Sequence, residues 1–173
     1  MVSVSLVREI SPMITALIAA GKIGSSIGAE LGSMKVTEQI DAMEVSGTNP
    51  FKYLVVTRVM AATLMLPLLS LCANAIAIYG GFLGVNIKGV VSWDLYWTQV
   101  FHALSYGDFI PSLAKTLFFG FTIGIIGCYK GYNSRKGTEG VGQSANSAVV
   151  VSSLLIFVLD LIAVQITDVL GLN

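Results

Sequence analysis

The chain has 173 residues, of which 54% are apolar and only 12% are charged. A typical soluble domain carries about 25% charged residues, and a chain this short has too much surface to hide so many apolar side chains from water. The composition therefore excludes a disordered chain and a soluble monomer, and it indicates an integral membrane protein. Ten basic residues balance ten acidic ones, so the charge does not favour a nucleic acid as partner.

Four apolar stretches are long enough to cross about 30 Å of hydrocarbon, which takes about 20 helical residues. They cover residues 10–31, 54–85, 110–129 and 148–170. None shows the alternating pattern of a membrane β-strand. We therefore expect an all-α fold, a single polytopic membrane domain over residues 1–173 with about four transmembrane helices.

Basic residues predict the orientation of these spans. Six of them flank the connectors at residues 34–53 and 130–146, namely Lys35, Lys52, Arg58, Lys130, Arg135 and Lys136. The positive-inside rule places this side in the cytoplasm and both chain ends outside it. A chain that starts at an outer span end suggests that a preceding segment is missing. The alternative is a genuine N-out protein.

The first connector predicts a short amphipathic helix on the cytoplasmic side. Val36, Ile40 and Met43 form one narrow apolar stripe at helical spacing, and Gly47 suits the end of the helix. Its acidic residues are Glu38, Asp41 and Glu44. A helix lying on lipid usually carries Lys and Arg instead, so the acidic character favours docking to another protein, although an interfacial helix remains the alternative.

Small residues recur every four positions in the spans. Gly24, Gly28 and Gly32 form such a row in the first span, and three shorter pairs repeat it at residues 80 and 84, 120 and 124, and 127 and 131. Rows of this kind let helix backbones approach closely in lipid. They predict tight packing, either within the subunit or across a dimer.

Between the second and third spans, Trp93, Tyr96 and Trp97 stand near His102, the single histidine. Aromatic residues of this kind gather at membrane interfaces. We expect an outer-side loop with a partly inserted helix.

Ionisable residues inside spans are costly and therefore candidates for function. They are Arg8, Glu9, Lys22, Glu30, Lys115 and Asp160. At 1.5 Å per residue, Lys115 and Asp160 both lie about 20 Å from the cytoplasmic ends of their spans, so either can compensate the other. The alternative for Arg8 and Lys115 is that they extend to the interface.

No motif for ATP binding by a phosphate loop, for zinc proteolysis or for a serine nucleophile occurs in the sequence. Cys72 and Cys128 lie in apolar runs and read as small hydrophobic residues. We expect neither a metal nor a cofactor, and no enzymatic activity in this chain.

Residues 6–50 are specific enough to suggest a family. The run LVREISPMITALIAAGKIGSSIGAELGSMKVTEQIDAMEVSGTNP, with GCYKGY at 127–132, GTEGVG at 137–142, and AVVVSS at 148–153 followed by Asp160, closely resembles the signature of MlaE (YrbE) permeases. These are the membrane subunits of MCE-associated ABC transporters. The family has an upstream interfacial helix and one more span, which agrees with a missing segment. It often has Arg where this chain has Lys22.

The resemblance implies a homodimeric permease in the bacterial inner membrane that moves phospholipids or related lipids between the inner and outer membranes. Its partners would be a cytoplasmic ABC ATPase, an MCE-domain protein on the outer side and often a STAS-domain subunit. Glu38, Gln39, Asp41 and Glu44 would then lie on the coupling helix that meets the ATPase, and Arg8, Glu9, Lys115 and Asp160 would line the lipid cavity.

Other classes stay open from the residues alone. Asp160 and Glu30 would also suit an ion- or proton-coupled secondary transporter or channel, which needs no ATPase. A structural membrane subunit without transport fits the length but leaves the intramembrane charges unexplained.

Overall fold

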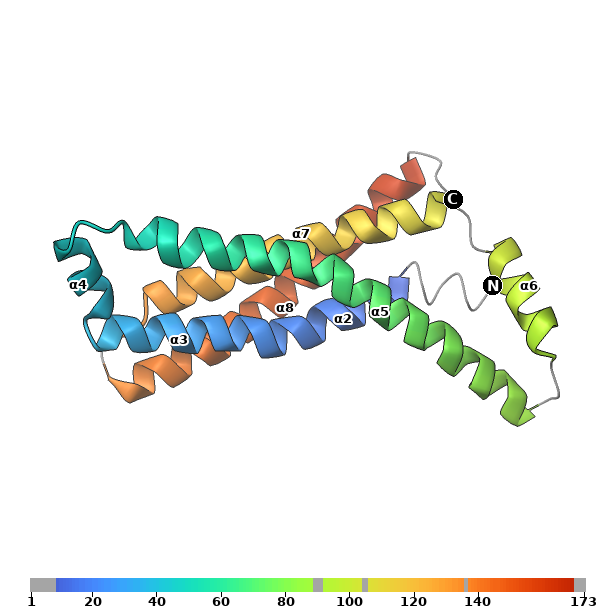
Figure 1. Cartoon of the computed structure of the whole chain (residues 1–173), viewed down its shortest axis with the longest axis horizontal. Coiled ribbons are helices and arrows are strands. Elements are labelled where there is room, and N and C mark those ends of the chain that lie inside the picture. Colours follow the sequence, from blue (N-terminus) through green and yellow to red (C-terminus); the bar gives the residue numbers. More distant parts are fainter. Residues whose placement is uncertain (1–8, 89–91, 104–105, 136, 170–173) are drawn as a thin grey trace.

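The computed structural model describes residues 9–88, 92–103, 106–135 and 137–169, and these contain helices and no strand. Four helices are long and apolar enough to cross a membrane: Ser11–Val36, Phe51–Ile87, Ile110–Tyr132 and Thr138–Val169. They lie lengthwise in one elongated bundle (Figure 1). The prediction of an all-α polytopic membrane protein is confirmed.

The first span is a continuous rod of three segments. Helix α2 (Ser11–Ala19) begins with Pro12 in its first turn, a π-helical turn η2 (Ala20–Gly24) follows, and α3 (Ser25–Val36) completes the rod. Proline suits this position because the first turn of a helix has no intrahelical partner for its N–H groups. The rod runs five residues beyond the predicted span.

The second span consists of the π-helical turns η3 (Phe51–Val56) and α5 (Thr57–Lys88). The latter contains Pro67, which removes one backbone hydrogen bond and favours a bend. Figure 1 shows α5 diverging from the bundle in its second half.

Beyond that divergence, α6 (Trp93–Ala103) packs on α5 through aromatic rings. Trp93 lies edge-on to Phe82 with 4.6 Å between the ring centroids. The hydroxyl of Tyr96 donates to the Ile78 carbonyl at 2.9 Å. The expected helix between the second and third spans is therefore present, and its place on the outer side stays a prediction. The side chain of His102 lies outside the described residues.

The last two spans are α7 (Tyr106–Tyr132) and α8 (Thr138–Val169). The prediction of a connector over residues 130–146 was wrong, because α8 already begins at Thr138. The residues between 138 and 147 are mostly small or polar, so they lack an apolar signal, yet they are helical; they include two glycines but no proline. The helix thus extends beyond the apolar layer.

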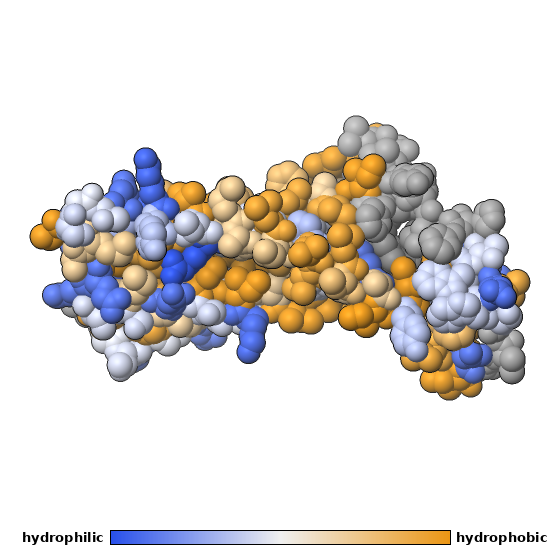
Figure 2. Space-filling model, in the orientation of Figure 1, coloured by the Kyte–Doolittle hydropathy of each residue, from blue (hydrophilic) through white to orange (hydrophobic). Residues whose placement is uncertain are grey.

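The two ends of the bundle differ in character. The α4 helix, described below, and the connector from α7 to α8 lie at one end, which we call the α4 end; α6 marks the opposite, α6 end (Figure 1). Hydrophilic residues gather at both ends, with a broad apolar belt between them (Figure 2). The alternation agrees with the predicted topology, and the assignment of the α4 end to the cytoplasm stays a prediction.

The glycine row of the first span packs within the chain, not against open space. A Cβ added at Gly28 would lie 3.2 Å from the Ala145 Cα and 3.3 Å from the Ala148 Cβ of α8. Gly32 faces Ser144 and Ser134, while Gly24 faces Ile123 and Ser152 at an ordinary 3.6 Å. The row therefore brings α3 against α8. Of the two alternatives, these glycines serve packing inside the subunit.

Candidate functional site

A cluster of three charged side chains lies toward the α6 end of the bundle. Lys115 of α7 donates to both carboxylate oxygens of Glu9, at 3.0 Å and 2.9 Å, and its Nζ lies 3.5 Å from Asp160 Oδ1 of α8. The lysine side chain is 4% exposed, against 33% for Glu9 and 15% for Asp160. The structure thus brings together residues that are 106 and 45 positions apart. Arg8, the fourth predicted member, lies outside the described residues.

The cluster has an electrostatic consequence that the sequence did not suggest. One buried ammonium faces two carboxylates, so the described part of the cluster carries a net charge of −1. Lys115 is therefore not a free cation waiting for an anion.

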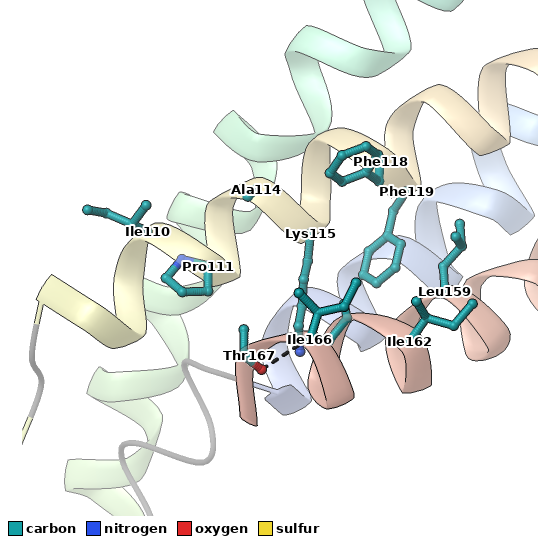
Figure 3. A pocket seen from close by; sticks show the side chains of 11 residues that line it. Ile110, Pro111, Ala114, Lys115, Phe118, Phe119, Leu159, Ile162, Ile166 and Thr167 are labelled. Carbon is teal, nitrogen blue, oxygen red and sulfur yellow. Dashed lines mark hydrogen bonds between the residues drawn. The ribbon is translucent and has the colours of Figure 1, made fainter. Parts of the chain in front are cut away.

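An apolar cavity of about 410 Å³ opens beside Lys115, between α7 and α8. Figure 3 shows Lys115 reaching from α7 toward Ile166 and Thr167 of α8, and Phe118, Phe119 and Leu159 also line the cavity. This volume falls in the range of about 300–1,000 Å³ that is usual for ligand sites, which are mostly apolar with a few polar groups. The combination can hold a molecule with one charged group and an apolar tail.

Sequence reasoning missed a set of buried polar side chains in the same part of the bundle. The set comprises Ser11, Thr15, Ser70, Asn74, Ser112 and Thr116. Asn74 is 5% exposed, and its Oδ1 has no hydrogen-bond partner among the described residues. The sequence does contain a signal for this set, because the amide of Asn74 stands within an apolar run, where polar side chains are candidates for function.

The other two intramembrane charges lie elsewhere. Glu30 accepts a hydrogen bond of 2.6 Å from Arg58 of α5. Lys22 lies in the π-helical turn of the first span, and its side chain is exposed on the surface of the bundle. Neither belongs to the charged cluster.

At the α4 end, the predicted amphipathic helix is shorter than expected. The first span continues through Val36, Glu38 takes a left-handed conformation (φ 57°), and α4 covers only Gln39–Val45. The Thr37 hydroxyl and N–H both bond the Ser33 carbonyl, which closes α3 and allows the chain to turn. Val36 therefore belongs to the span, and Glu38 belongs to the joint.

Helix α4 docks on the bundle by Ile40 and the partly buried Met43, and it leaves its acidic side open. Ile40 is 0% exposed and packs with Leu31 and Leu54. The four predicted coupling residues are all exposed: Glu38, Gln39, Asp41 and Glu44. Asp41 is paired with Lys35 at 3.0 Å, so two of the three carboxylates have no ion-pair partner among the described residues.

Comparisons with known proteins identify a matching family and several relatives. A family model described as "Permease MlaE" matches residues 1–166. A probable ABC transporter permease protein of Rickettsia typhi is 46% identical over 157 residues, which are 91% of this chain and 61% of the relative. A similarly named protein of Synechocystis is 40% identical over 156 residues, 90% of this chain and 59% of that protein. The chain thus spans about three fifths of the length of these relatives.

Proposed function

The chain belongs to the MlaE permease family, and we propose that it forms the membrane subunit of an ABC transporter that moves phospholipids or related lipids between the inner and outer membranes of a bacterium. One observation carries the lipid assignment: the buried Lys115 cluster opens onto an apolar cavity. A phosphate headgroup would bind Lys115 in exchange for one of the carboxylates, because charge-assisted hydrogen bonds to an ammonium are strong. Acyl chains suit the apolar walls.

The partners follow from the family and from the two ends. A cytoplasmic ATPase docks on the acidic face of α4, and an MCE-domain protein meets the α6 end. A STAS-domain subunit is a further partner of the complex. The protein then resides in the inner membrane with the α4 end in the cytoplasm, as the basic residues there favour.

A second copy of the chain completes the proposed assembly. The exposed face of the first span changes from Ile14 and Ile18 to Lys22, Ser26 and Glu30 along its length. Exposed charges at this depth are costly against lipid and ordinarily face protein or a water-filled cavity. A homodimer that shields this face removes the cost.

Native mass spectrometry of the complex, extracted from its own membrane in mild detergent, tests the assembly. We expect two copies of the chain, an ATPase and bound phospholipid. A single copy without an ATPase would contradict the proposal and favour a secondary transporter.

Filling the cavity should displace the lipid. Ala163 lines the cavity and Leu161, two residues away on α8, is 69% exposed outside it. We expect Ala163→Phe to lower the amount of co-purified phospholipid about tenfold, the equivalent of about 1.4 kcal/mol, whereas Leu161→Phe leaves it unchanged. Lipid extraction and quantification by mass spectrometry measure both. Equal lipid in the two variants would place the lipid elsewhere.

Reversing charge on α4 should release the ATPase without unfolding the membrane domain. The Lys35–Asp41 pair is exposed, and exposed pairs contribute only about 0–1 kcal/mol, so Glu38→Lys with Asp41→Lys should scarcely change the melting temperature. We expect ATPase co-purification to fall steeply. Glu139→Lys, which changes an exposed acid at the start of α8, is the control. An intact, active complex in the double variant would contradict the coupling role.

A further inference from the structure

A second pocket, remote from the cavity, lies at the α4 end between the last turn of α7 and the first turns of α8. Its volume is about 200 Å³ and its lining is mostly polar. The connector that closes it folds back closely on α8. A Cβ added at Gly140 would collide with the Arg135 carbonyl. Asn133 further ties the connector to α7 by donating to the Tyr129 carbonyl at 2.9 Å. The connector is therefore held against both α7 and α8, and the pocket lies between them.

The lining contains two cations and, besides polar groups that bond to the backbone, two neutral polar side chains without a partner among the described residues. Lys130 and Arg135 supply the charge, and Gln143 and Ser147 supply an amide and a hydroxyl. Across the part of the chain that the structure describes, none of these four side chains has a hydrogen-bond or ion-pair partner. The acid nearest in sequence, Glu139, does not line the pocket. A site with two unpaired cations and hydrogen-bonding neighbours is suited to an anion, and a guanidinium matches phosphate in particular.

The position of the pocket relative to the membrane decides which phosphate groups can reach it. Helix α8 has 32 residues, or about 48 Å at 1.5 Å per residue, which exceeds the roughly 30 Å hydrocarbon layer. The polar stretch at its start ends at Ser147, and the apolar run begins at Ala148. Tyr129, exposed beside Lys130, is a residue typical of the interface. The pocket thus lies at headgroup level, immediately beyond the hydrocarbon.

We propose that this pocket binds the phosphate group of an anionic phospholipid from the adjacent leaflet. Basic pockets between transmembrane helices are suited to anionic headgroups. The volume suits a headgroup without its acyl chains, which extend instead along Ile125 and Val150, both exposed, one or two turns further into the membrane. The site is at the opposite end from Lys115 and is independent of the proposed transport cavity.

Binding of phosphatidylglycerol, counted by native mass spectrometry of the purified protein in detergent, tests the site. We expect Arg135→Gln to weaken binding about tenfold, and Lys130→Gln with Arg135→Gln to weaken it further. Lys52→Gln is the matched control, because Lys52 is an exposed cation at the same end outside the pocket. We expect that control to bind as the unaltered protein does, and phosphatidylcholine to bind more weakly than phosphatidylglycerol.

Three results would overturn the proposal. The first is equal phosphatidylglycerol binding by Arg135→Gln and Lys52→Gln. The second is an Arg135-dependent rise in melting temperature with inorganic phosphate, in the absence of lipid, that equals the rise with phosphatidylglycerol. The occupant would then be free phosphate. The third is loss of a co-purifying protein, instead of a lipid, from the Arg135 variant.

Discussion

Lys115→Leu should destabilise the protein more than any other single change in the cluster, by about 3–5 kcal/mol. The substitution removes the ammonium that contacts both Glu9 and Asp160 in a largely buried site. Removing one partner of a buried pair costs this much because the remaining charge stays desolvated. The melting temperature of the purified protein in detergent, followed by size-exclusion chromatography after heating, measures the loss.

Controls separate the stability of the cluster from its role in transport. Asp160→Asn should be milder, because Lys115 keeps Glu9 at 2.9 Å. Combining Glu9→Gln, Lys115→Leu and Asp160→Leu removes every described charge, and a neutral replacement of a buried ion group is often as stable as the original. We therefore expect this triple variant to recover the melting temperature.

The triple variant should still fail to move lipid. If the charged cluster receives the headgroup, transfer of a fluorescent phospholipid between vesicles and an acceptor protein stays low although the fold has recovered. Normal transfer would show that the charges serve stability alone. An unchanged melting temperature for Lys115→Leu would instead show that the three side chains do not form the buried cluster.

The number and order of the spans were predictable because they depend on composition and period. Each of the four apolar runs lies in a helix that is long and apolar enough to cross a membrane, and Lys115 and Asp160 could be matched in height from residue counts alone. Glu9 was a candidate, but its hydrogen bonds with Lys115 depend on how α2 approaches α7. That approach is a tertiary property, which a one-dimensional pattern does not encode.

The misjudged boundaries have local causes. The residues that open α8 are polar, and hydropathy measures solvent preference, not helix formation, so the helix extended beyond its apolar part. At the other boundary, the stripe of Val36, Ile40 and Met43 continued across a break. The left-handed turn at Glu38 is uncommon for a residue other than Gly, Asn or Asp, so no sequence signal marked it.

Gly120→Ala should force apart two spans of the bundle. A Cβ at Gly120 would lie 2.6 Å from the Ala62 carbonyl oxygen and 2.9 Å from the Thr63 Cα, both backbone atoms of α5. Backbone cannot rotate away as a side chain does, so α5 and α7 have to separate. Overpacking of this kind costs about 1–3 kcal/mol, and we expect the melting temperature in detergent to fall accordingly.

The chain supplies its own control for this prediction. Gly80 and Gly84 repeat the same four-residue spacing on α5, but a Cβ at either would meet nothing within 4 Å among the described atoms. Alanine there should stabilise the helix by up to about 1 kcal/mol, since glycine has more conformational freedom to lose. The same motif is therefore expected to give opposite signs at two places. Equal changes in melting temperature for Gly120→Ala and Gly84→Ala would contradict the backbone-to-backbone contact of α5 with α7. The glycine spacing would then reflect only the high glycine content of membrane helices.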